Sequence, residues 1–188
     1  MRVALIPVPY DLGRADEGLG AGVPLLAATL DAHAKASHDI GVVEGDARGA
    51  LREGLAAVPQ EHVAHVGGRD LDRAQDERLE RSAILRVRPS EPVERALDEL
   101  AARVASVFVH VDLDVLDPSV GVANRYAAGG GLSLEDVERV VDAVGRRFAI
   151  RAAALTAYEP GCDPERRIPA AARAIFEQIV AVRDPLPA

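Results

Sequence analysis

The chain has one cysteine, no tryptophan and only one lysine among its 22 basic residues. Because Cys162 has no second cysteine to pair with, no internal disulfide can form, which suits the reducing cytoplasm. Three Phe and three Tyr are the only aromatic residues. The core must therefore consist mainly of Ala, Val and Leu.

Basic charge and long apolar runs are also lacking. The net charge of −8 argues against nonspecific binding to nucleic acid or to anionic membranes, since both require a basic surface. No apolar run approaches the roughly 20 residues that a membrane-spanning helix needs. The short apolar run at the start is broken by Pro7 and Pro9, unlike a secretion signal. We therefore expect a cytoplasmic protein.

The length and the hydrophobic content of the chain are sufficient for one hydrophobic core. With 188 residues, 48% of them hydrophobic, we expect residues 1–188 to form a single domain. Short apolar runs alternate with amphipathic stretches, which is typical of an α/β fold with three αβα layers around a mostly parallel sheet. The expected strands are 2–6, 40–43, 62–66, 84–87, 107–114 and 151–158, and the expected helices are 25–36, 47–57, 73–81, 92–105, 134–148 and 169–182.

The stretch from Val107 to Pro118 carries two carboxylates on an apolar, β-branched run and ends at an Asp-Pro turn. Successive strand side chains point to opposite faces, so His110, Asp112 and Asp114 are expected to share one face. Adjacent carboxylates repel each other unless a proton or a cation lies between them. The pattern predicts a hard-metal site at the carboxyl end of a parallel strand. The alternative is that the two acids cap a neighbouring helix or loop.

The segment from His110 to Pro118, followed by Gly129 to Ser133, resembles the ureohydrolase superfamily of arginases and agmatinases. In that family an Asp-x-Asp-x-x-Asp-Pro run precedes a Gly-Gly-Leu-Ser helix start. Three further segments occur in the family's order, at 9–14, 66–72 and 159–163. The resemblance implies a shortened arginase-like fold. It also implies a hydrolase that cleaves a linear guanidino or amidino C–N bond of a small molecule with Mn²⁺-activated hydroxide.

The resemblance also implies roles for particular residues. Asp112 and Asp114 would be Mn²⁺ ligands. Asp117 would orient the turn without touching the metal, and His110 would lie hydrogen-bonded beside the site. Glu159 is a weak candidate for substrate binding.

Two family motifs that supply further metal ligands are missing. Gly-Gly-Asp-His does not occur. A literal Asp-Ala-His stands at Asp31 to His33, but Lys35 replaces the last acid and no strand precedes it, so we interpret it as a chance match. Compared with the family, we expect an internal segment to be missing near residues 46–60. Ala157 stands where the arginase branch carries a guanidinium-binding Glu. The sequence therefore predicts an incomplete metal site.

Three functions remain open. The first is the Mn²⁺-dependent hydrolase, and the second is an inactive remnant that serves as a binding or assembly module. Loss of inner strands would expose apolar edges, so we expect either marginal stability or self-association as a homo-oligomer. The third is a phosphotransferase or phosphatase of the haloacid dehalogenase type, which the pattern Asp112-x-Asp114-Val115 also fits. That family needs a lysine after the motif. The only lysine of this chain, Lys35, lies before it, which counts against this function.

Overall fold

The computed structural model describes residues 4–5, 10–11, 14–15, 36–37 and 58–182. The expected strand at 40–43 and the expected helix at 47–57 lie outside these residues. So does the expected helix at 25–36, apart from Ala36, which is extended. Within the described part, no helix is long and apolar enough to cross a membrane.

The strands of the described part form four two-stranded sheets, three of them parallel. The parallel pairs confirm the predicted α/β class. Near the start of the chain, β1 (Ala4–Leu5) pairs in parallel with β4 (Ala36–Ser37), and β2 (Tyr10–Asp11) pairs in antiparallel with β3 (Arg14–Ala15).

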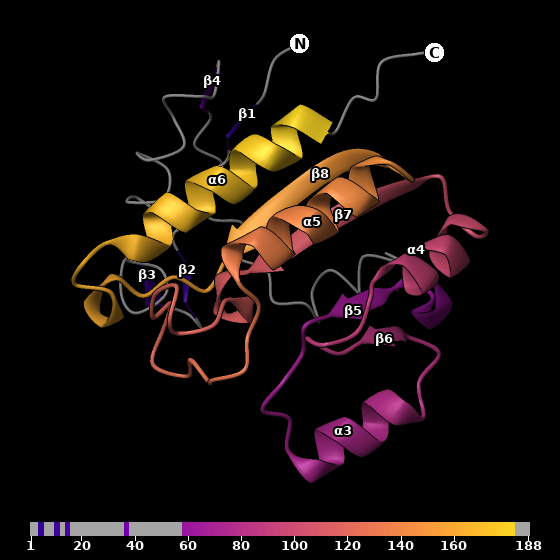
Figure 1. Ribbon diagram of the computed structural model, residues 1–188, viewed down its shortest axis with the longest axis horizontal. Coiled ribbons are helices and arrows are strands. Elements are labelled where there is room, and N and C mark those ends of the chain that lie inside the picture. Colours follow the sequence, from indigo (N-terminus) through magenta and orange to yellow (C-terminus); the bar gives the residue numbers. More distant parts are fainter. Residues whose placement is uncertain (1–3, 6–9, 12–13, 16–35, 38–57, 183–188) are drawn as a thin grey trace.

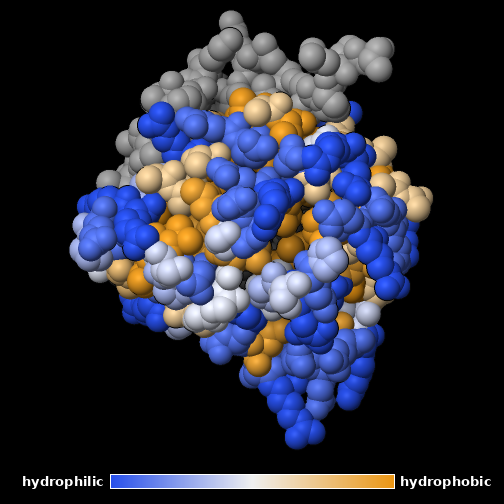
Figure 2. Space-filling view, in the orientation of Figure 1, coloured by the Kyte–Doolittle hydropathy of each residue, from blue (hydrophilic) through white to orange (hydrophobic). Residues whose placement is uncertain are grey.

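The first well-described unit contains β5 (Ala64–Val66) and β6 (Leu85–Val87), which pair in parallel. The connecting helix α3 (Arg73–Glu80) buries no residue and forms a hydrophilic protrusion (Figures 1 and 2). Helix α4 (Glu94–Ala101) packs against both strands. Its apolar stripe joins a core cluster whose buried members are Val87, Val93, Leu97, Leu100, Ala143 and Phe148.

The second unit contains β7 (Ser106–Asp112) and β8 (Ala149–Thr156), which pair in parallel with Asp112 opposite Thr156. Helix α5 (Leu134–Gly145) connects them, and α6 (Arg167–Val182) packs against α5. Both helices contact β8 (Figure 1). Exposure alternates along β7 as the sequence pattern predicts. This alternation sets which side chains of β7 face the core.

A large core lies beneath the end of β7. Leu113, Ile168 and Ile175 are fully buried in it, with Leu116 almost as inaccessible. The expected helix start before α5 is confirmed, because Ser133 and Asp136 form a reciprocal capping box. Strand β8 ends at Thr156, two residues earlier than predicted.

Candidate functional site

The site begins where β7 ends. Asp112 is the last residue of β7, and Asp114 lies in a 3₁₀ turn, Leu113–Val115, rather than on the strand. The expectation that both acids continue one strand face is therefore wrong. Asp112 Oδ1 accepts a hydrogen bond from the Asp114 N–H at 2.9 Å, which closes the turn. Asp112 thus performs the capping role that was the alternative to metal binding.

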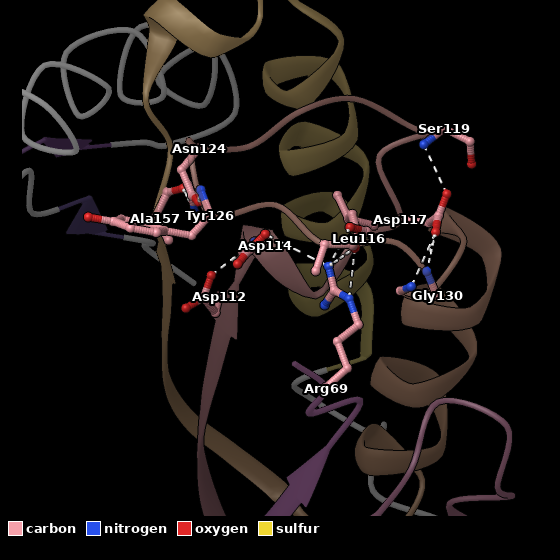
Figure 3. A network of polar contacts seen from close by, with 12 residues as sticks. Arg69, Asp112, Asp114, Leu116, Asp117, Ser119, Asn124, Tyr126, Gly130 and Ala157 are labelled. Carbon is pink, nitrogen blue, oxygen red and sulfur yellow. Dashed lines mark hydrogen bonds and ion pairs between the residues drawn. The ribbon is translucent and has the colours of Figure 1, made fainter. Parts of the chain in front are cut away.

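Asp114 carries an unsatisfied polar atom. Its Oδ1 is buried without a hydrogen-bond partner, and Arg69 Nη2 lies 3.8 Å away, beyond hydrogen-bond distance (Figure 3). Burial raises the pKa of Asp114 above its ordinary value. The charge of Arg69 opposes this pKa shift, while Asp112 adds to it. The turn therefore holds a partly desolvated carboxylate that lacks full compensation.

Asp117 ties the turn after β7 to the loop that leads into α5. Its Oδ1 accepts from the Ser119 N–H at 2.9 Å, and its Oδ2 accepts from the N–H groups of Gly130 at 2.9 Å and Gly131 at 3.2 Å (Figure 3). Hydrogen bonds from Ser119, followed by those from the two glycines, lower the pKa of Asp117 to about 2. Asp117 therefore stays ionised and holds the two segments together.

The end of β8 lies beside the same loop. Ala157 has a left-handed backbone (φ 67°), which is uncommon for a residue with a Cβ. Asn124, 3% exposed, donates from Nδ2 to the Ala157 carbonyl at 3.1 Å and accepts from the Tyr126 N–H at 2.8 Å (Figure 3). The Glu159 N–H donates to the Ala123 carbonyl at 2.7 Å. The residues after β8 are thereby fixed next to the loop.

Glu159 already has a cationic partner. Arg125 Nε donates to Glu159 Oε2 at 3.0 Å, and Arg125 Nη2 bonds the other carboxylate oxygen. The Glu159 side chain is only 14% exposed. Hydrogen bonding by Arg125 lowers the pKa of Glu159 below its ordinary value. Because β8 ends at Thr156, Ala157 and Glu159 lie beyond the strand and do not share a strand face.

His110 lies on β7 next to this end of the sheet. Its Nε2 is 2.8 Å from Thr156 Oγ1, which joins β7 to β8 through a side-chain hydrogen bond. Thr156 is also the register partner of Asp112. The His110 ring therefore links β7 to β8 close to Asp112, at the end of β7.

Three residues of the site had no predicted role: Arg69, Asn124 and Arg125. Arg69 lies in the Val66–Asp72 segment, whose family pattern was visible without indicating a contact. Asn124 is the only asparagine in the sequence and directly follows Val122 and Ala123. A lone amide after apolar residues is a signal that could have indicated a buried, hydrogen-bonded side chain. Arg125 gave no signal, because its partner lies 34 residues later in the chain.

Comparison with known proteins identifies the family of the chain. The family model described as "Arginase family" matches residues 21–181. The chain belongs to the arginase family. It is 29% identical over 90 residues to an agmatinase of Halalkalibacterium halodurans, an alignment that covers 47% of this chain and 30% of the agmatinase.

Solved structures of the arginase family share the fold. An arginase from Bacillus subtilis superposes with a TM-score of 0.76 at 16% identity, covering 96% of this chain and 98% of that one. The arginase from Bacillus caldovelox gives a TM-score of 0.62 at 22% identity and covers 95% of this chain. The match spans 60% of the Bacillus caldovelox chain.

A hard divalent ion takes about six donors, more than the acids in this part of the chain provide. Among residues 58–182 and the described residues before them, no group of three or more His, Cys, Asp or Glu side chains is placed to hold a metal. Asp112 and Asp114 supply two carboxylates, and the buried Asp114 Oδ1 lacks a partner. These two carboxylates would hold at most one hard divalent ion, with water completing its coordination. The described residues alone would not hold two ions.

Proposed function

We propose that this chain is a metal-dependent hydrolase that acts on a linear guanidino or amidino compound, with Asp112 and Asp114 as ligands of a divalent ion. The observation that carries the proposal is the buried, unpartnered Oδ1 of Asp114 beside Asp112 at the carboxyl end of β7. A desolvated carboxylate without a hydrogen bond is costly unless a cation compensates it. Membership of the arginase family favours Mn²⁺ as that cation.

The ion, when bound, supplies a nucleophile near neutral pH by lowering the pKa of water. The residues of the chain hold and orient the reacting groups. Asp117 fixes the turn that carries Asp114. Asn124 holds the residues after β8 at the same edge of the sheet, so Glu159 is the candidate for binding the substrate cation. A guanidinium substrate must then displace Arg125 from Glu159.

The test is urea release from arginine, agmatine and related guanidines with excess Mn²⁺. Asp112→Asn and Asp114→Asn should each abolish Mn²⁺-dependent turnover. Glu135→Gln, on the exposed first turn of α5, is the matched control and should leave turnover unchanged. Absence of turnover in the unmutated protein would contradict the proposal.

The second candidate is a non-catalytic binding or assembly module. Two acids of the site already face arginines: Asp114 lies near Arg69, and Glu159 is paired with Arg125. Such compensation allows the fold to persist without a metal. In that case Mn²⁺ would neither raise the Tm nor remain with the purified protein in metal analysis. Turnover with Mn²⁺ would rule out this candidate.

Two further aspects belong to this proposal. The lone Cys162 suits a reducing compartment, so we place the protein in the cytoplasm. In the described part of the chain, β7 and β8 pair only with each other, so each leaves one edge unpaired, and we propose that the chain self-associates into a homo-oligomer. Light scattering that shows only a monomer would contradict the oligomer.

A further inference from the structure

Arg69 connects two backbone segments that border the candidate site. Its side chain is 14% exposed. Nε and Nη2 donate to the Ala128 carbonyl at 3.0 and 2.8 Å, and Nη2 also lies 3.3 Å from the Leu116 carbonyl. Leu116 follows the turn that carries Asp114, and Ala128 belongs to the loop before α5. One guanidinium group therefore joins the turn to the loop (Figure 3).

The chain before Arg69 approaches this turn closely. Gly67 has a left-handed backbone (φ 75°), and a Cβ built there would lie 2.7 Å from Val115 Cγ2. Only glycine allows this approach without a shift of the turn. The residues after β5 are thereby held against the turn, which brings Arg69 within reach of the Leu116 carbonyl.

Arg69 attracts Asp114 without occupying its free oxygen. The separation of 3.8 Å between Arg69 Nη2 and Asp114 Oδ1 is too long for a hydrogen bond. The donors of Nε and Nη2 are instead directed at carbonyl oxygens. Asp114 Oδ1 is therefore left without a hydrogen bond although a cationic side chain lies next to it.

We propose that Arg69 is a positioning residue, which clamps the turn carrying Asp114 to the loop before α5 and keeps Asp114 Oδ1 available to a divalent cation. The inference rests on the proposed function, because it takes Asp114 as a ligand. The clamp depends on the planar fork of a guanidinium, which reaches two carbonyl groups at once. A lysine keeps the charge but cannot reproduce the fork.

The first measurement is the Kd for Mn²⁺ by titration calorimetry. Arg69→Lys and Arg69→Met should each weaken binding by about 10-fold or more, as is typical when a residue that orients a ligand is lost. Arg73→Met, at an exposed position of α3, is the matched control and should bind as the unmutated protein does. If Arg69 merely repels the cation, Arg69→Met would bind more tightly and Arg69→Lys would be unchanged. That result would overturn the proposal.

The second measurement is hydrogen exchange of the metal-free protein. The Asp117 N–H donates to the Leu132 carbonyl and the Leu132 N–H to the Val115 carbonyl, both at 2.8 Å, so these two amides report on the turn–loop contact. Their exchange should be faster in both Arg69 variants than in Arg73→Met. Unchanged exchange would overturn the clamp, and faster exchange with an unchanged Kd would overturn its link to Asp114.

The two measurements separate the two hypotheses. If the unmutated protein binds no Mn²⁺, the proposed function fails, and hydrogen exchange alone decides whether the clamp exists. If Arg69→Met does not fold, Arg69→Lys, which retains the charge, is used for both measurements.

Discussion

Arg125 and Glu159 form a two-point ion pair that joins the loop before α5 to the residues after β8. Glu159 is largely buried, whereas the Arg125 side chain is 60% exposed. The acid predicted to bind a substrate cation therefore already holds a guanidinium group of the chain itself. Arg125 is accessible enough to be displaced.

Arg125→Gln should increase the affinity of the site for guanidinium compounds if Glu159 binds the substrate. The KM for agmatine should fall several-fold, because the substrate no longer competes with Arg125. Steady-state kinetics measures the change, with Arg139→Gln on the exposed face of α5 as the control. An unchanged KM would exclude Glu159 as the substrate-binding acid.

Arg125→Gln should also change how the free energy of unfolding depends on pH in the acid range. Arg125 lowers the pKa of Glu159 in the folded state, so the pair stabilises the fold fully above the ordinary pKa of glutamate and loses this contribution as the pH falls below it. In Arg125→Gln the pKa of Glu159 should rise toward its ordinary value. Carboxyl NMR titration of both proteins measures the shift. Identical titration curves would show that the pair does not persist in solution.

Asp117→Asn should lower the Tm by about 2–4 °C, the shift that corresponds to a small loss of stability in a chain of this size. The lost contacts are charge-assisted hydrogen bonds from Ser119, Gly130 and Gly131. Because the folded pKa is about 2, the contribution of Asp117 is present above about pH 4 and disappears as the pH falls toward 2. Thermal melts should therefore differ between the variant and the unmutated protein at pH 7 and converge near pH 2. A constant difference across this range would contradict the assignment.

Asp114→Asn should not destabilise the metal-free protein. The amide replaces a buried carboxylate oxygen that has no hydrogen-bond partner, so the free energy of unfolding should stay the same or rise by up to about 1 kcal/mol. Any rise in Tm caused by Mn²⁺ should be lost at the same time. Urea denaturation with and without Mn²⁺ measures both effects. A large loss of metal-free stability would show that Asp114 has a structural role.

Gly131→Ala should destabilise the protein, whereas Gly129→Ala should have little effect. A Cβ at Gly131 would lie 2.6 Å from the Asp117 nitrogen and 2.7 Å from the Leu116 carbonyl carbon, both of them backbone atoms that cannot move aside. Such overpacking costs about 1–3 kcal/mol. A Cβ at Gly129 meets nothing within 4 Å. Equal stability of the two variants by denaturant unfolding would contradict this packing.

Local features of the site could be predicted because they depend on residues close in the sequence. The alternation along β7 places Val111 in the core and exposes Asp112, as the period of a strand requires. The helix start at Ser133 follows from the capping box with Asp136 three residues later. The end of β8 was misplaced because no residue near Ala157 indicates its left-handed backbone.

The sequence by itself determined the family, the α/β class and the pair of acids at the end of one strand, since motif order and side-chain period are properties of neighbouring residues. Only the tertiary structure decided what those acids contact. Arg69 reaches the Leu116 carbonyl across 47 residues, and Arg125 reaches Glu159 across 34. Which residues become such partners depends on which distant segments the tertiary structure brings together. Because the chain has many arginines, the sequence does not indicate which of them contacts a given acid. Periodicity therefore identified the end of β7, while the fold determined that Arg69 lies beside Asp114 there.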